Sequence, residues 1–203
     1  IEIEPRKQWP TGLGEPKGRI KAERQAQVGR AQARVGDGGW NVVIERLNVE
    51  AEAGTAPTSP VGKLPNELLP SLAAVLKRWD WDARPTWICP VPSRRRQPLI
   101  DAVADGLGAL GKLPVYRALV GQSSEEAPAT SFQRDQANSA HQVANVWHRF
   151  TVDSNALPDS ASLAGPVLLV DDEADSRWTV TVAAWLLTGE GSGPVLPLVL
   201  RAR

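Results

Sequence analysis

The sequence predicts an α/β fold built on a parallel, doubly wound sheet, with an N-terminal arm or small subdomain in front of it. Short apolar runs at 86–91, 115–120, 167–170 and 195–200 predict buried strands. Segments with the periodicity of amphipathic helices separate these runs. Strands that alternate with helices favour a parallel sheet with helices on both faces. A hydrophobic fraction of 42% in 203 residues is enough for one ordinary core and an appendage.

The first part of the chain is less regular. Residues 1–39 are polar and rich in glycine and basic residues, and 42–47 could form a short helix. Residues 50–62 are rich in Ala, Pro, Thr and Ser, a composition typical of linkers. We therefore expect 1–62 to be an arm or linker without a core of its own, and 63–203 to be the folded domain.

Helical patterns place the remaining elements of that domain. Apolar residues recur at helical spacing over 68–79, with Asn66 as a possible N-cap, and again over 99–110 and 140–147. The segment 178–187 predicts a last helix in front of the final strand. The stretch 121–136 is long and polar, and a loop of this length inside a domain is usually functional or mobile.

Composition narrows the setting of the protein. The formal net charge is zero, so bulk charge does not call for nucleic acid or a membrane. A single cysteine, Cys89, excludes an internal disulfide and favours a reducing, cytoplasmic compartment, where Cys89 serves as a small core residue. No apolar run approaches ~18 residues, so we expect a soluble protein with no membrane partner. The absence of methionine predicts that the chain is a piece of something longer.

The most informative stretch of the chain is GPVLLVDDEADSRWTVT, from Gly165 to Thr181. An apolar strand ends on Asp171 and Asp172, and a polar turn then leads into a helix. Carboxylates at a strand end can accept hydrogen bonds from a cis-diol and can bind Mg²⁺. The turn and the first helical N–H groups can hold a phosphate. The alternative is an acidic turn in which Asp175 or Ser176 caps the helix.

A basic loop follows the first core strand, at Pro92-Ser93-Arg94-Arg95-Arg96. Backbone N–H groups and cations suit a diphosphate, so Ser93, Arg94 and Arg95 are candidate pyrophosphate contacts. A solvated basic turn and contact with a DNA backbone are the alternatives. Ligands of parallel sheets bind beyond the carboxyl ends of the strands. The basic loop and the acidic turn both lie at such ends, so the sequence predicts that they form two halves of one site.

The acidic segment resembles the ribose-phosphate signature of the type I phosphoribosyltransferases, which implies a Rossmann-like core and a ligand such as PRPP with Mg²⁺. The resemblance makes Asp171 and Asp172 ribose and metal ligands and gives Asp175 a catalytic part in proton transfer. It places the ribose 5-phosphate against Asp171, Asp172, Ser176, Arg177, Trp178 and Thr179. Arg177 stands where the family has glycine. Its side chain could fill the pocket, pair with Asp172 or Asp175, or add a charge to a bound phosphate.

A wider resemblance covers nearly the whole chain. The strings VPSRRR, QANSAHQVANVW, GPVLLVDD and VLPLVL, together with WPTG and GDGGW, are similar to the ComF-type phosphoribosyltransferase-like C-terminal domain of bacterial RecQ-like DNA helicases. This resemblance implies a DNA repair setting, in which an N-terminal helicase module of the parent chain contacts DNA. The present chain has no Walker A motif, so ATP hydrolysis would belong to that module.

Two functions remain open at this point. One is a non-catalytic accessory domain that binds phosphate or a nucleotide weakly, and Arg177 favours it. The other is an active PRPP-dependent phosphoribosyltransferase, which the intact acids Asp171, Asp172 and Asp175 favour.

Overall fold

The structure of the chain is a computed structural model that describes residues 1–11, 13, 15–53, 64–122 and 139–203. Most of the predicted linker and most of the predicted polar loop fall on 54–63 and 123–138 and lie outside the described residues. Within the described part, no helix combines the length and the apolar character needed to cross a bilayer.

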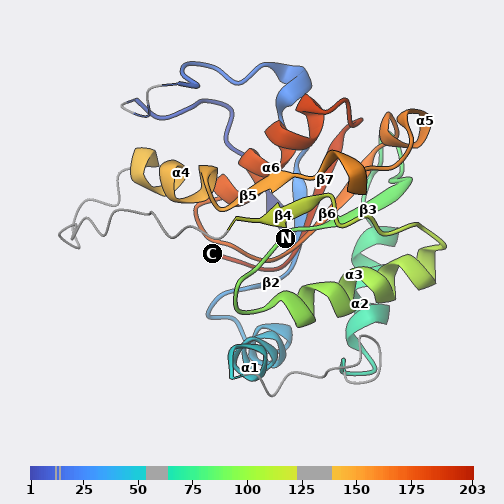
Figure 1. Cartoon of the computed structure of the whole chain (residues 1–203). Helices are drawn as coiled ribbons and strands as arrows, with labels where there is room; N and C mark the ends of the chain where they lie inside the picture. Colours follow the sequence, from blue (N-terminus) through green and yellow to red (C-terminus); the bar gives the residue numbers. More distant parts are fainter. Residues whose placement is uncertain (12, 14, 54–63, 123–138) are drawn as a thin grey trace.

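A five-stranded sheet forms the centre of the molecule, and four of its strands are parallel (Figure 1). The order is β1-β2-β7-β6-β3, with β1 antiparallel at one edge. The strands are β1 (Glu2–Ile3), β2 (Gly29–Arg34), β3 (Trp87–Pro90), β6 (Val167–Ala174) and β7 (Val195–Ala202). β6 lies between β7 and β3, so the acidic segment begins on an inner strand, as predicted. The α/β class with a parallel sheet is confirmed.

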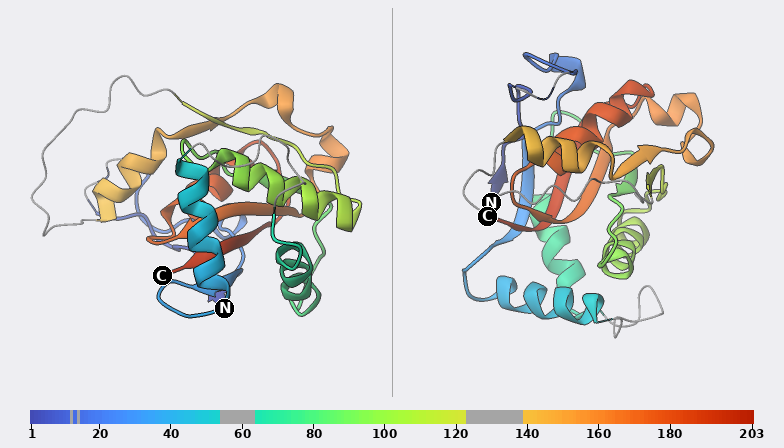
Figure 2. Two further views of the ribbon diagram at one scale, coloured as in Figure 1. Left: turned by 90° about the horizontal axis from the view of Figure 1, so that it is seen from below. Right: turned by 60° about the vertical axis from the view of Figure 1, so that its left-hand side comes forward.

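Helices cover both faces of this sheet (Figures 1 and 2). One face carries α1 (Trp40–Glu52), α2 (Leu68–Lys77) and α3 (Gln97–Gly111). The other carries α4 (Ser139–Trp147) and α6 (Trp178–Gly189). A one-turn helix, α5 (Ser160–Leu163), and two short 3-10 turns, Ala22–Arg24 and Ser154–Ala156, complete the helical elements of the described residues.

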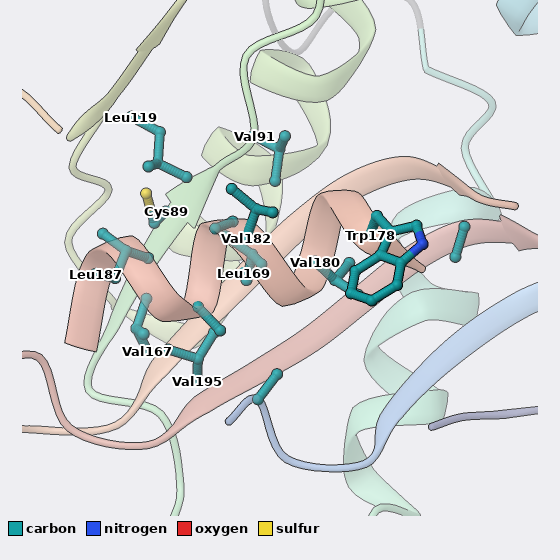
Figure 3. Packing of buried hydrophobic residues seen from close by; sticks show 14 of the residues in the cluster. Cys89, Val91, Leu119, Val167, Leu169, Trp178, Val180, Val182, Leu187 and Val195 are labelled. Atoms are coloured by element: carbon teal, nitrogen blue, oxygen red, sulfur yellow. The ribbon is translucent and has the colours of Figure 1, made fainter. Parts of the chain in front are cut away.

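Alternation along the strands divides the core into two layers. Val167 and Leu169 of β6 point to the α6 face, whereas Leu168 and Val170 point to the face of α2 and α3. Figure 3 shows the first layer, in which Val182 and Leu187 of α6 pack over the strands. Because both faces are buried, the inner strands are continuous apolar runs, and this is why they could be predicted from the sequence.

The N-terminal segment adds strands to the same sheet. β2 pairs in parallel with β7, and its inward residues Ala31 and Ala33 are buried in the two core layers. β2 has little signal in the sequence, because small alanines alternate there with arginine and glutamine and no apolar run results. The junction expected at 62/63 lies outside the described residues.

Other elements differ in detail from those expected. The strand predicted at 115–120 is shorter: β4 (Leu119–Gly121) pairs with β5 (Phe150–Val152) in a separate two-stranded sheet. Val115 makes only an isolated bridge to Ile88. At the start of α2 the N-cap is Glu67 rather than Asn66, and its side chain makes no capping hydrogen bond.

A candidate anion-binding cleft

A cleft of about 730 Å³ opens where β3 and β6 end. Its lining includes the basic loop at Ser93–Arg95 and the acidic turn from Asp172 to Thr179, except Trp178. The last residues of β7, with Arg201 and Arg203, complete one side. The two predicted halves therefore share one cleft, because parallel strands bring their carboxyl ends to the same edge of the sheet.

The described lining of this cleft is positively charged on balance. It contains seven arginines and four acidic residues, in a chain whose formal net charge is zero. The arginines come from four separate regions, namely the loop after β3, the α4–β5 junction, the turn before α6 and the end of β7. Arginine forks match the geometry of phosphate oxygens, so this lining suits an anionic ligand.

Asp171 does not line the cleft, although the sequence placed it among the ribose and metal ligands. Its side chain is buried, with 4% of the residue exposed, and its Oδ1 accepts a hydrogen bond from the N–H of Asp172 at 2.9 Å. Burial, followed by the negative charge of Asp172, raises the pKa of Asp171 well above its usual range, and the charge of Arg149 offsets only part of this. Asp171 is thus an interior acid.

Asp172 does line the cleft, but an arginine already holds it. Its Oδ2 lies 2.6 Å from Nη1 of Arg96, and Nη2 of the same guanidinium lies 2.7 Å from Oε1 of Glu52. The side chains of Arg96 and Asp172 are only 23% and 13% exposed. Arg96 therefore ties the loop after β3 to both α1 and the end of β6.

Local hydrogen bonds fix the loop that presents Arg96. The N–H of Ser93 donates to Oε1 of Gln97 at 2.8 Å, and the N–H of Arg96 donates to Oγ of Ser93 at 3.2 Å. Arg94 and Arg95 project from this turn as exposed residues, and Nη2 of Arg94 donates to the carbonyl of Gln122 at 3.3 Å. The sequence singled out Ser93, Arg94 and Arg95 as contacts and missed the structural role of Arg96.

The turn before α6 has an unusual backbone at Arg177. This residue has φ = 67°, in the left-handed region that favours glycine, which is the residue the resemblance expects here. Its Nη1 donates to the carbonyl of Glu4 at 3.4 Å, and it forms no ion pair with Asp172 or Asp175. The possibility that Arg177 neutralises these acids is therefore wrong, since the side chain turns toward the N-terminal segment.

The turn before α6 offers a backbone donor to the cleft, because the N–H of Trp178 is bonded to Oγ of Ser176 but that of Arg177 is free within the described part of the chain. Ser176, Arg177 and Thr179 line it, and the N-cap residue makes no side-chain capping bond. The N–H of Arg177 finds no acceptor among the described residues, and the first N–H groups of a helix have no partner within the helix. Unpaired donors at a helix N-terminus attract anions.

Trp178, which the sequence assigned to ligand binding, belongs to the core instead. The residue is 2% exposed and does not line the cleft. Its ring stacks on Trp9 with a centroid distance of 6.0 Å, and Trp9 also contacts Trp147 at 5.3 Å. Trp178, the first residue of α6, thus packs against the N-terminal segment at Trp9, and Trp9 in turn contacts α4.

Arg201 of β7 and Arg203, which follows that strand, organise the remaining acids, and the sequence did not single them out. Glu173 accepts hydrogen bonds from Arg201 at 2.6 Å and from Arg203 at 3.0 Å. Burial alone would raise the pKa of Glu173, but these bonds outweigh it and lower the pKa. Asp175, the candidate proton-transfer residue, lines the cleft with a side chain that is 68% exposed, 3.8 Å from Arg203. Arg201 and Arg203 could have been found from the sequence, because they are charged residues directly after the apolar run 195–200.

The donors for a protein-bound metal are not assembled in the described part of the chain. No group of three or more His, Cys, Asp or Glu side chains there could hold an ion. Asp171 and Asp172, the expected Mg²⁺ ligands, are respectively buried and paired with Arg96. These two carboxylates do not fit a metal held by the protein alone, which would need additional oxygen ligands.

Comparisons with known proteins give a weak structural likeness. No family model matches the chain, and no curated protein matches it significantly. Among solved structures, the chain is similar to adenine phosphoribosyltransferase from Leishmania tarentolae, with a TM-score of 0.42 and 12% sequence identity. The similarity covers 68% of this chain and 72% of that one. A likeness at this TM-score carries no conclusion about this chain, so its fold and the chemistry of its cleft rest on its own residues.

Proposed function

We propose that the chain is a phosphoribosyltransferase-like module that binds a phosphorylated ligand in this cleft and does not transfer its phosphoribosyl group. One observation carries the proposal. Donors for anions line the cleft on two sides, whereas the acids that would hold a ribose are engaged elsewhere, Asp171 in the interior and Asp172 with Arg96.

The binding half of the proposal follows from complementary charge and free donors. The exposed Arg95 faces the cleft from one side, and the unpaired N–H of Arg177 lies on the other. A phosphate or diphosphate can accept charge-assisted hydrogen bonds from both. Inorganic phosphate, pyrophosphate, PRPP and nucleotides all carry this chemistry.

The non-catalytic half follows from the position of the acids. Phosphoribosyl transfer needs the ribose held close to its reacting geometry, and a misplacement of ~1 Å can reduce the rate about a hundredfold. Asp172 would have to leave Arg96 before it could accept a hydrogen bond from a ribose hydroxyl.

The setting of the module is part of the proposal. The motifs shared with RecQ-like DNA helicases support an accessory domain whose parent chain carries the helicase module and contacts DNA. In that setting the cleft would report on a phosphorylated metabolite rather than convert it. Gel-shift assays with single-stranded and duplex DNA test whether the chain itself adds to DNA binding, and we expect it to add little.

An active phosphoribosyltransferase is the second candidate. It is favoured by the presence of Asp172, Asp175 and Thr179 on one cleft that also includes the basic loop. An incoming PRPP could draw Arg96 to its pyrophosphate and free Asp172 at the same time.

Calorimetric titration tests the binding half of the proposal. Pyrophosphate, ribose 5-phosphate, PRPP and nucleoside monophosphates are titrated with and without Mg²⁺ into the unchanged protein, Arg95→Ala and Ser176→Ala. We expect binding of at least pyrophosphate, weakened about tenfold by Arg95→Ala because a charge-assisted bond is lost. Arg78→Ala removes an exposed arginine at the end of α2 and should leave the affinity unchanged. Absence of binding, or equal affinity in all variants, would refute the proposal.

A further inference from the structure

The N-terminal segment touches the turn before α6 from outside the cleft. Nε of Arg6 donates to the carbonyl of Ser176 at 3.1 Å, and the guanidinium lies 5.5 Å from the ring centroid of Trp178. Arg6 is not among the residues that line the cleft, whereas Ser176 and Arg177 are. Arg6 therefore contacts the turn on the side of the tryptophan core.

Peptide geometry relates this contact to the anion site. In a trans peptide the carbonyl of one residue and the N–H of the next point in opposite directions. The carbonyl of Ser176 points to Arg6, so the N–H of Arg177 points away from it, and this N–H has no acceptor among the described residues. The bond to Arg6 thus sets the direction of an anion donor.

A second chain of bonds from Arg6 reaches the other side of Arg177. The N–H of Arg6 donates to Oγ1 of Thr181 at 3.0 Å, and that hydroxyl donates to the carbonyl of Arg177 at 2.8 Å. The side chain of Arg6 thereby holds the carbonyl of Ser176, and its backbone N–H reaches the carbonyl of Arg177 through Thr181. A non-glycine residue at φ = 67° persists only where its surroundings hold it, and these bonds supply that restraint.

We propose that Arg6 is a positioning residue of the anion site, which keeps the N–H of Arg177 directed into the cleft. This inference rests on the proposed phosphate-binding function and assigns it a dependence on the N-terminal segment. A change in that segment, for example by a domain attached before it, would change the affinity of the cleft without touching the ligand.

The test compares Arg6→Ala and Arg6→Lys with Lys7→Ala, a neighbouring exposed residue, as the control for lost charge. Lysine keeps the charge but places a methylene where arginine has Nε. Calorimetry measures the affinity for inorganic pyrophosphate, and ¹⁵N relaxation measures the order parameter of the Arg177 N–H. We expect both Arg6 variants to bind about fivefold more weakly, because an oriented donor is lost. The order parameter should fall from about 0.85 to below about 0.6, and the control should change neither value.

The results distinguish failure of the positioning role of Arg6 from failure of the proposed phosphate binding. Unchanged affinity in both Arg6 variants overturns the positioning role, and so does full affinity in Arg6→Lys alone, which would reduce the effect to charge. If the unchanged protein binds no pyrophosphate, the proposed function fails. The order parameter then decides whether Arg6 orients the turn, and a rigid Arg177 N–H in Arg6→Ala would refute it.

Discussion

Nη1 of Arg96 lies 2.6 Å from Oδ2 of Asp172, and this contact engages the carboxylate that the phosphoribosyltransferase resemblance assigns to ribose. The sequence had drawn attention to Arg177 as the residue that departs from the family. In the structure Arg177 turns to the carbonyl of Glu4 and leaves the acids alone. If the site is inactive, the cause would therefore be Arg96, which follows the predicted contacts Ser93–Arg95 in the loop after β3.

Removing the guanidinium of Arg96 should free Asp172 and weaken the fold. Arg96→Gln leaves Glu52, Asp172 and Glu173 without their shared cation, so we expect a loss of about 1–2 kcal/mol in the free energy of unfolding. Ribose 5-phosphate should bind several-fold more tightly once the carboxylate is accessible, whereas pyrophosphate should bind more weakly. Urea unfolding and calorimetry measure the two effects.

Arg117→Gln is the matched control for this change. Arg117 pairs with Asp101 and Asp105 away from the cleft, and its side chain is 46% exposed. A pair this exposed contributes less than about 1 kcal/mol, and ligand affinity should not change. Equal ribose 5-phosphate affinity in Arg96→Gln and the unchanged protein would show that the ion pair does not limit access to Asp172.

Glycine at position 177 should stabilise the protein without creating activity. Arg177→Gly removes the strain of a left-handed residue, and we expect up to about 1 kcal/mol of added stability after the greater freedom of glycine in the unfolded chain is counted. Lys112→Gly, at φ = 52° after α3, should stabilise by a similar amount and serves as the control. Urea midpoints test both, and destabilisation by Arg177→Gly alone would show that its side-chain contacts outweigh the strain.

The buried Asp171 predicts a particular dependence of stability on pH. Its folded pKa is raised, so the folded state keeps a proton that the unfolded state releases as the pH rises above about 4. Stability should therefore fall as the pH rises toward the folded pKa. Asp171→Asn replaces the acid with a group that does not titrate, so the free energy of unfolding should fall less between pH 4.5 and pH 7. Urea unfolding of the two proteins at these two pH values makes the comparison. Identical pH dependence in the two proteins would contradict the burial of a titrating acid.

The sheet could be predicted well wherever its strands are inner strands. β6 and β7 are buried on both faces and so appear as apolar runs in the sequence. β2 could not be found in this way, because Ala31 and Ala33 fill its inner positions and carry little hydrophobic signal. Pairing with β7, a contact between distant parts of the chain, makes this segment a strand.

The site could be predicted as a place, and less well as a set of contacts. The rule for strand ends correctly brought Ser93–Arg95 and Ser176 to one cleft. Spacing along the chain could not show that Arg96 reaches Asp172, that Trp178 packs against Trp9, or that Arg6 holds the turn from behind. Each of these depends on a side chain meeting a residue far away in sequence.

Release of pyrophosphate from PRPP in the presence of Mg²⁺ is the measurement that tests the central claim most directly. It is run on the unchanged protein and on Asp172→Ala, with binding of PRPP measured in parallel. A module that binds without transferring should bind PRPP or pyrophosphate. It should form no pyrophosphate from PRPP above the uncatalysed rate. Pyrophosphate release by the unchanged protein that Asp172→Ala abolishes would contradict the account and establish an active phosphoribosyltransferase.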